Sequence, residues 1–211
     1  MSIEGGAAST RPRGRRAGAG GVREQILEVA TEQFGDLGYQ AATVRRIAAA
    51  AGVDSKLVHY YFGGKEDLFA VVIAEAFTSF DVPAVLDDSS QRGAATPGTR
   101  YLYAILSALE DSRVGRACIG LVRNLGSHEE SRRIFMRFVT EQLIDRLAPR
   151  LQGDFAETRV ALTGAHILGI VMARYVLQLP PLASLSREDL ARATGPTIDR
   201  YLFGDAGLPV R

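Results

Sequence analysis

The chain has 211 residues, of which 46% are hydrophobic and 23% are charged, a composition typical of a globular protein with a buried core. Its single cysteine, Cys118, excludes a disulfide scaffold and a multi-cysteine metal site, and indicates a reducing compartment. The formal net charge of +1 excludes no partner, but residues 1–65 hold nine basic and six acidic side chains, so positive charge is concentrated toward the N-terminus.

Residues 1–20 are rich in glycine and arginine and have no periodic apolar residues, so we expect a disordered basic tail. Four arginines are clustered in this tail, namely Arg11, Arg13, Arg15 and Arg16. They are either solvated, or they contact the phosphates or a minor groove of DNA. The tail lacks the apolar segment of a secretory signal, and no stretch of the chain approaches the ~18 apolar residues that a membrane-spanning helix requires. The sequence therefore predicts a cytoplasmic protein with no membrane partner.

Helical periodicity covers residues 22–37, and Gly38 is placed to end this first helix. Two short helices are predicted next, over residues 44–50 and 55–62. A pair of glycines then interrupts the pattern, and a longer helix follows over residues 66–80. The first third of the chain is therefore expected to hold four helices, two of them short and closely spaced.

The two short helices and the turn between them have the residues that a helix-turn-helix requires. Thr43 and Asp54 are favourable N-caps for the two helices. Ala48 is small where the second helix crosses the first, and Gly52 accommodates a positive φ in the turn. The inner positions are apolar, and they are Ile47, Ala51, Val53, Val58 and Tyr61. The pattern predicts a helix-turn-helix whose second helix enters the DNA major groove, although a helix corner with no role in DNA binding has the same spacing.

The outward positions of the second short helix carry side chains suited to DNA. Lys56 can donate to guanine or to a phosphate, Ser55 can donate or accept, and Leu57 can contact a thymine methyl group. Lys65 begins a helix, where backbone N–H groups favour a phosphate. The candidate DNA-binding residues are Thr43, Arg45, Ser55, Lys56, Leu57, His59, Tyr60, Tyr61 and Lys65.

Beyond a loop over residues 83–97, the chain is again helical in pattern, and no alternation is long enough to predict a strand. Ser186 and Asp189 have the spacing of a capping box before a last helix, which we expect to be kinked at Pro196. The predicted fold class is therefore all-α. The helices expected in this part span about residues 98–111, 113–126, 129–150, 154–179 and 187–203.

Residues 43–48, 51–53 and 59–69, together with the first helix, resemble the N-terminal domain of TetR-family (TetR/AcrR-like) transcriptional regulators over about residues 22–72. Weaker similarity over residues 169–177 is typical of an actinobacterial-type subgroup. The resemblance implies an N-terminal three-helix helix-turn-helix DNA-binding domain and a helical C-terminal ligand-binding and dimerisation domain. The expected division is a disordered basic tail (1–20), a helix-turn-helix domain (21–65) and a helical effector-binding and dimerisation domain (66–211).

Two positions depart from the family's pattern. Many members have tyrosine where this chain has His59, and many have a small residue where it has Lys56. The phosphate contact of that tyrosine would here be made by an imidazole, and Lys56 could reach bases that a small side chain cannot. The operator of a relative is therefore no guide to the operator of this chain.

The resemblance also implies a homodimer formed by the last two long helices and a small-molecule effector bound in the helical body. The candidate dimer residues, each with burial inside the subunit as the alternative, are Leu162, Ala165, Gly169, Ala173, Ile198 and Leu202. The candidate effector-binding residues are Phe77, Tyr103, Leu106, Val122, Phe135, Phe138, His166 and Arg174. Because most of these are apolar, we expect a hydrophobic effector. If it is buried, Arg174 requires an acceptor, which is either an acidic neighbour or an acidic ligand.

The sequence has no nucleophile elbow, Walker A, dinucleotide-binding or zinc-protease motif, so we expect no catalysis, no cofactor and no metal. We interpret the chain as a ligand-responsive repressor that binds a palindromic operator in double-stranded DNA as a homodimer and is released by a small molecule. Two alternatives stay open. One is a transcriptional activator of the same family, and the other is a helical small-molecule-binding protein whose helix-turn-helix is structural.

Overall fold

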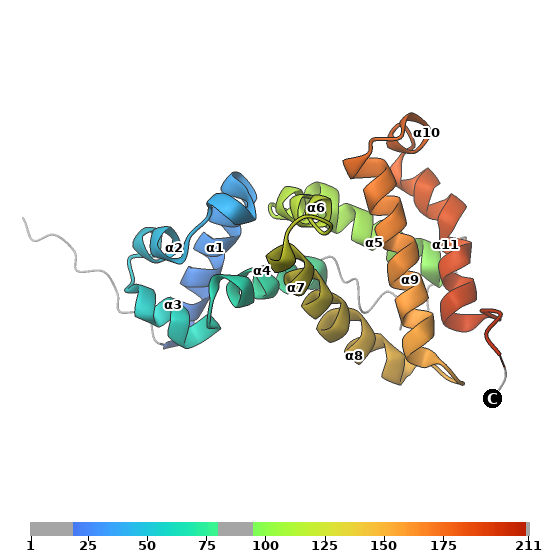
Figure 1. Ribbon diagram of the computed structural model, residues 1–211, viewed down its shortest axis with the longest axis horizontal. Coiled ribbons are helices and arrows are strands. Elements are labelled where there is room, and N and C mark those ends of the chain that lie inside the picture. Colours follow the sequence, from blue (N-terminus) through green and yellow to red (C-terminus); the bar gives the residue numbers. More distant parts are fainter. Residues whose placement is uncertain (1–18, 80–94, 210–211) are drawn as a thin grey trace, which may run out of the picture.

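The structure is a computed structural model that describes residues 19–79 and 95–209, and the regular elements within these ranges are all helices (Figure 1). This confirms the predicted all-α class. The four arginines of the expected basic tail lie outside the described residues, as does most of the expected loop over residues 83–97. No helix within the described ranges is long and apolar enough to cross a lipid bilayer.

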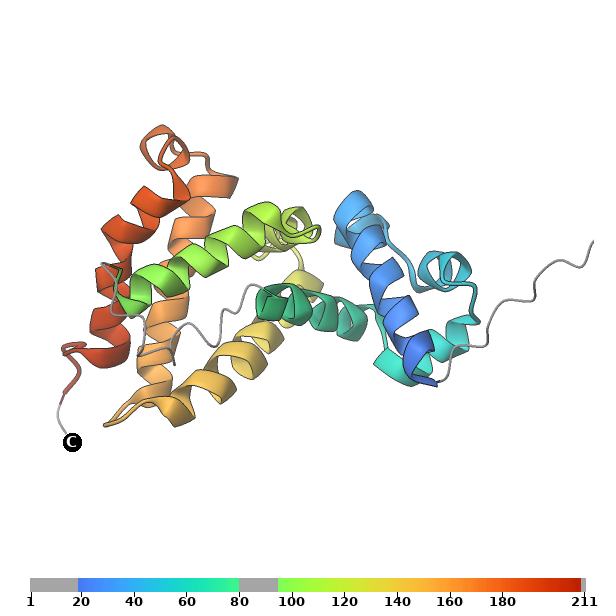
Figure 2. The same cartoon turned by 180° about the vertical axis from the view of Figure 1, so that it is seen from behind.

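Three N-terminal helices form a unit that we call the head, namely α1 (Ala19–Ala41), α2 (Val44–Ala50) and α3 (Ser55–Phe62). Helix α4 (Lys65–Ser79) leads from the head into the rest of the molecule, which we call the body. The body contains α5 (Pro97–Asp111), α6 (Gly115–Arg123), α7 (Glu129–Phe138), α8 (Asp145–Leu147), α9 (Ala156–Val171), α10 (Pro180–Ala183) and α11 (Arg187–Phe203). Figure 2 shows α9 and α11 side by side at the end of the body farthest from the head.

The head folds as its capping and turn residues predict. Thr43 Oγ1 accepts a hydrogen bond from the backbone N–H of Arg46 (3.2 Å), and Asp54 Oδ1 accepts one from that of Lys56 (2.7 Å). Gly38 has a φ of 77° where α1 is interrupted, and Gly52 has a φ of 65° in the turn between α2 and α3. The predicted bounds of both short helices are confirmed, because local capping and turn chemistry sets them.

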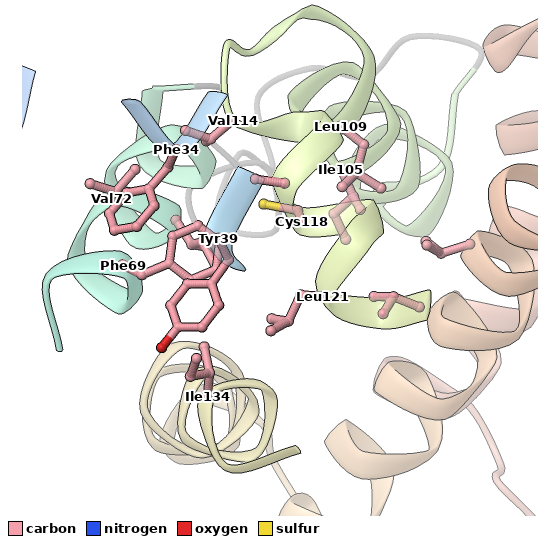
Figure 3. Packing of buried hydrophobic residues seen from close by; sticks show 14 of the residues in the cluster. Phe34, Tyr39, Phe69, Val72, Ile105, Leu109, Val114, Cys118, Leu121 and Ile134 are labelled. Carbon is pink, nitrogen blue, oxygen red and sulfur yellow. The ribbon is translucent and has the colours of Figure 1, made fainter. Parts of the chain in front are cut away.

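A continuous hydrophobic core joins the head to the body (Figure 3). The ring of Phe69 in α4 lies 4.7 Å from that of Phe34 and 4.9 Å from that of Tyr39, measured between centroids. The hydroxyl group of Tyr39 points toward α7, the helix that carries Ile134. Tyr39 therefore contacts both α4 and α7, so the head meets the body at α7 as well as through α4.

Two predicted long helices are interrupted in the structure. The helix expected over residues 129–150 continues after α7 as a π-helical segment, Val139–Ile144, and α8 then gives way to a 3₁₀ turn, Ala148–Arg150. Pro149 lies in that turn and has no N–H to extend an α-helix. The π-helical segment begins well before Pro149, and helical periodicity does not predict it.

The helix expected over residues 154–179 is also shorter than predicted. Helix α9 ends at Val171, and a second π-helical segment, Met172–Val176, follows it. Pro180 and Pro181 follow the expected helix and begin α10, since proline is well suited to the first turn of a helix. In α11, Ser186 caps the backbone N–H of Asp189 (3.0 Å), and the helix continues through Pro196.

Candidate functional site

Helix α3 presents most of its predicted contact residues to solvent. Lys56 and His59 are exposed, Leu57 is 38% exposed and Tyr60 is 80% exposed, whereas Ser55 is half-buried. The opposite face of the helix is anchored in the core of the head by Val58 and Phe62. A helix with one anchored apolar face and an exposed face of lysine, imidazole, phenol and aliphatic groups has the chemistry needed to read a DNA groove.

The acidic residue at the start of α3 is compatible with nearby DNA. The Asp54 carboxylate accepts the backbone N–H of Lys56, so its negative charge interacts with the positive end of the helix. The hydroxyl group of Thr43 uses its oxygen as an acceptor at the start of α2 and keeps its O–H as a donor for a phosphate. Arg45 is exposed in the first turn of the same helix.

His59 has one of its two ring nitrogens already occupied. Nδ1 lies 2.6 Å from the carbonyl oxygen of Gly63, and because a carbonyl only accepts, Nδ1 must carry the proton. The other nitrogen, Nε2, is therefore an acceptor when the ring is neutral and a donor only when the ring is protonated. Tyr61, which follows on the inner side, is half-buried and packs edge-on against Tyr60 at 5.1 Å between centroids.

The turn between α3 and α4 brings a cation and free helix N–H groups together. Lys65 Nζ lies 4.1 Å from the centroid of the Tyr39 ring and 3.4 Å from the carbonyl oxygen of Gln40. Partial burial lowers the pKa of this lysine. Asp67 Oδ2 accepts the backbone N–H of Gly64 (2.7 Å), and this hydrogen bond, followed by contact with Arg137, lowers the pKa of Asp67.

The body contains an apolar cavity with a volume of about 260 Å³. Four predicted effector-binding residues line it, namely Phe77, Val122, Phe135 and Phe138. None of the lining residues is charged within the part of the chain that the structure describes. Cys118 also lines the cavity, and burial raises the pKa of its thiol to about 12, so the thiol is neutral. The arrangement is suited to a hydrophobic molecule without a charged group.

The other four predicted effector-binding residues lie elsewhere. Leu106 is fully buried in the core, and Tyr103 lies on another part of the surface of α5, beside Arg187. His166 faces α11, where its ring meets that of Tyr201 edge-on at 6.1 Å. Helical spacing placed these side chains in the body but did not determine which of them face the same cavity.

Arg174 has the acidic neighbour that its burial requires. Its side chain is 10% exposed, and Nη2 lies 3.2 Å from Glu110 Oε1. Nη1 donates to the carbonyl oxygens of Leu182 (2.6 Å) and Leu185 (2.9 Å). Arg174 therefore holds α10 and the start of α11 against α5, and it does not line the apolar cavity.

The predicted dimer residues fall into two groups. Ala165 and Gly169 are exposed on α9, and Leu162 and Ala173 are half-buried beside them. In contrast, Ile198 is 0% exposed and Leu202 is 1% exposed in α11, because both pack inside the subunit. For these two residues the alternative of burial within the subunit applies, and a partner chain could not reach them.

Sequence reasoning missed most of the cavity wall, which consists of aliphatic and small residues. Apolar spacing places most of these residues in helices of the body, and Ala165 is one of the candidate dimer residues, but only the crossing of six segments shows that they enclose one space. The missed residues are Ile73, Ile105, Leu109, Cys118, Leu121, Met136, Val139, Leu143, Ala161, Gly164, Ala165, Ile167, Leu168 and Val171.

Two protein-family models match the chain. Residues 26–72 match the bacterial regulatory proteins of the tetR family, and residues 96–202 match the tetracyclin repressor-like C-terminal domain. The HTH-type transcriptional regulator BetI of Rhizobium meliloti is 28% identical over 168 residues, which is 76% of this chain and 81% of BetI. The HTH-type transcriptional repressor AcnR of Corynebacterium glutamicum is 42% identical over 53 residues, which is 25% of this chain and 28% of AcnR.

Solved structures of transcriptional regulators also resemble this chain. A TetR-family regulator from Streptomyces coelicolor A3 is 31% identical and has a TM-score of 0.59, with 90% of this chain and 99% of that chain covered. The regulator FadR from Bacillus subtilis, in complex with stearoyl-CoA, is 18% identical with a TM-score of 0.56, and 86% of this chain and 98% of that chain are covered. The second likeness concerns the fold alone.

Proposed function

Because this chain belongs to the tetR family of bacterial transcriptional regulators, we propose that it is a repressor that binds a palindromic operator as a homodimer and leaves it when a small hydrophobic molecule fills the body. The single observation that carries the proposal is the exposed face of α3, held on an anchored helix whose acidic cap is already hydrogen-bonded. Since its target is DNA, the compartment that we propose is the cytoplasm. The proposed domains are residues 21–65 for DNA and 66–211 for effector and partner, after a tail over residues 1–20.

In the proposed complex, two sets of residues have different tasks. Phosphate contacts position the protein on DNA without reading sequence, and base contacts supply specificity. We assign phosphate contacts to Thr43, His59, Tyr60, Tyr61 and Lys65, and base contacts to Arg45, Ser55, Lys56 and Leu57. Tyr60 suits its task because it is highly exposed, whereas Tyr61 is half-buried.

The effector that we propose is uncharged and largely apolar. Aromatic and aliphatic side chains surround the cavity, and a charged ligand group would lose its hydration there without gaining an ionic partner. Arg174 is not a partner for an acidic effector in this proposal, because Glu110 and two carbonyl groups already bind it. The ligand would act by binding one arrangement of the head more tightly than the other.

The proposed partner is a second copy of the chain, docked through the exposed side of α9. Ala165 and Gly169 allow close approach there, and Leu162 and Ala173 add apolar surface. Two-fold symmetry would place two recognition helices in successive major grooves, with a separation of ~34–36 Å or somewhat more. Ile198 and Leu202 are not part of the proposed interface.

Selection of random duplex DNA on the purified protein, followed by titration at two salt concentrations, tests the proposal. We expect an enriched palindrome, two chains per site and a logarithmic salt slope of several units, since each neutralised phosphate contributes about 0.9. Addition of the neutral probe N-phenyl-1-naphthylamine should weaken binding. Sequence-blind binding that persists after unfolding and refolding would instead indicate a small-molecule-binding protein with a structural head. A reporter gene behind the selected site separates repression from activation.

A further inference from the structure

Helix α7 presents two chemically different faces to two parts of the molecule. On one side, Phe135 and Phe138 line the apolar cavity. On the other side, Glu130, Arg133 and Arg137 contact the head and the first turn of α4. A single ten-residue helix therefore touches both the proposed effector site and the elements that hold the proposed DNA-binding face.

The contacts toward the head are polar and specific. The hydroxyl group of Tyr39 donates to Glu130 Oε1 over 2.6 Å, along the direction visible in Figure 3. Arg133 pairs with Glu66 at 2.7 Å, and Arg137 Nη1 pairs with Asp67 Oδ1. Tyr39 in turn lies beneath Lys65, so α7 supports the phosphate-binding turn at two points.

Asp67 connects α7 directly to that turn. Its Oδ1 atom accepts from Arg137, while its Oδ2 atom accepts the backbone N–H of Gly64, the residue before α4 begins. This is the half of a capping box in which an acidic side chain in the first helical turn returns to the backbone before the helix. The carboxylate thus lies beside Lys65 and the free N–H groups that would receive a phosphate.

The charge balance at this turn depends on Arg137. With Arg137 in place, the negative charge of Asp67 is paired, and the turn offers Lys65 and backbone N–H groups to an incoming phosphate. Without it, the carboxylate keeps the Gly64 N–H but loses its ionic partner, and its charge repels the incoming phosphate. A shift of α7 away from α4 would therefore weaken phosphate binding without altering any residue on the recognition helix.

Two features of the body are consistent with a shift of α7. A π-helical segment, Val139–Ile144, follows α7 directly, and Val139 and Leu143 within it line the cavity. Such π-turns inside helices are frequent at functional sites. Arg137 also has a second acceptor on this segment, since its Nε lies 2.8 Å from Glu141 Oε1. The guanidinium group can thus leave Asp67 and remain paired.

Resting on the function proposed above, we propose that Arg137 is a positioning residue that links occupancy of the apolar cavity to DNA affinity, by pairing with Asp67 when the cavity is empty and leaving it when the cavity is filled. The cavity ligand moves α7 through Phe135 and Phe138. The loss of pairing then places the Asp67 charge against the phosphate that Lys65 and the α4 N-terminus bind.

A double-mutant cycle tests this link on the full chain, with the duplex obtained by selection. Arg137→Gln should weaken DNA binding about fivefold, a typical size for a coupling between sites. Asp67→Asn keeps an acceptor for the Gly64 N–H but removes the charge, so it should strengthen binding. In the Asp67→Asn background, Arg137→Gln should change the affinity less than about twofold, because the charge that it compensates is absent.

Titration with N-phenyl-1-naphthylamine gives a measurement that would not change if the role of Arg137 were purely structural. The probe should reduce the DNA affinity of the wild type, and its effect should fall below about twofold in Arg137→Gln, with the probe still binding the cavity. Arg132→Gln is the matched control, since Arg132 is on the same helix but pairs with Glu129 within it. Its DNA affinity and probe response should equal those of the wild type.

Additive penalties in the double mutant, or an Arg137→Gln protein that behaves like Arg132→Gln, would overturn the proposal while leaving the proposed function intact. A probe that occupies the cavity without changing the DNA affinity of the wild type would also overturn it. A wild type that binds no duplex in a sequence-dependent way would remove the proposed function and this inference together.

Discussion

His59 stands on the exposed face of α3 with Nδ1 already committed to the Gly63 carbonyl group. A phosphate oxygen is an acceptor, so Nε2 can bind it only after the ring takes up a second proton. The Gly63 contact therefore fixes which ring nitrogen is left for a phosphate, and that nitrogen carries no proton in the neutral ring.

We predict that His59→Gln binds the selected duplex at least as tightly as the wild type. A glutamine amide donates to a phosphate without taking up a proton, whereas Nε2 of the neutral His59 ring cannot. His59→Ala, which has no donor, should bind more weakly than His59→Gln in the same titration. His128→Gln is the control, because His128 lies in the body at the start of α7. Equal affinities for His59→Gln and His59→Ala would contradict the phosphate contact given to this position.

Truncation of Lys56 and truncation of Lys65 are predicted to change DNA binding in different ways. Lys56→Ala should lower affinity by ~1–3 kcal/mol and relax the sequence preference, because a base contact is lost. Lys65→Ala should weaken binding to all duplexes alike and reduce the logarithmic salt slope by about one unit. Titrations of each variant on the selected site and on scrambled duplexes measure both effects. A loss in Lys65→Ala that is confined to one sequence would rule out a phosphate contact.

At the scale of elements, the crossing of α5 and α11 depends on two glycines. A Cβ atom on Gly195 would lie 2.4 Å from Thr99 Oγ1 and 2.5 Å from Thr99 Cα, and one on Gly98 would lie 2.4 Å from the Gly195 carbonyl oxygen. The backbone N–H of Gly98 also donates to Asp199 Oδ1 over 2.7 Å. The two helices thus touch backbone to backbone, and neither glycine was singled out by periodicity.

Gly195→Ala should lower the free energy of unfolding by ~1–3 kcal/mol, since the added methyl group meets backbone atoms that cannot rotate away. Chemical denaturation followed by circular dichroism measures the change. Gly120→Ala in α6 is the control, because nothing lies within 4 Å of the added Cβ there. It should be neutral or stabilising by up to ~1 kcal/mol, as alanine favours a helix over glycine. Equal stabilities for the two variants would show that α5 and α11 can separate without cost.

At the scale of the whole molecule, the proposed dimer can be tested on α9. A Cβ atom on Gly169 would meet nothing within 4 Å in the subunit, so a large side chain fits the isolated chain. Gly169→Arg should place two charges in the proposed two-fold interface, and light scattering should then give the mass of one chain where the wild type gives two. Ala183→Arg, on exposed α10, should remain a dimer. A dimeric Gly169→Arg protein would move the interface away from this side of α9.

The head shows how much local chemistry can determine. Thr43 and Asp54 cap their helices as predicted, and Gly52 has the positive φ that the turn required. Each of these features depends on residues within a few positions along the chain, so sequence reasoning reaches them. The amphipathic pattern of α3 also separated its exposed contact residues from Val58 on the buried side.

The helical class of the body was predicted from the sequence, but the surroundings of its individual side chains were not. Helical spacing marked Phe77 and Leu106 alike as inward-facing, yet Phe77 lines the cavity and Leu106 is sealed in the core. Likewise, Ile198 and Gly169 lie on neighbouring helices, and only one of them is at the surface. Which inward faces meet, and which leave a space between them, depends on how several helices cross.

The sequence by itself determined the all-α class and the bounds of α2 and α3, because capping residues, turn glycines and helical spacing are local properties of the chain. Its resemblance over about residues 22–72 identified the family. Tertiary structure alone decided where the cavity lies, that Arg174 pairs with Glu110, and that Arg137 reaches Asp67 across 70 positions of sequence. These contacts join residues that are remote in the chain, and their partners are selected by the packing of whole helices.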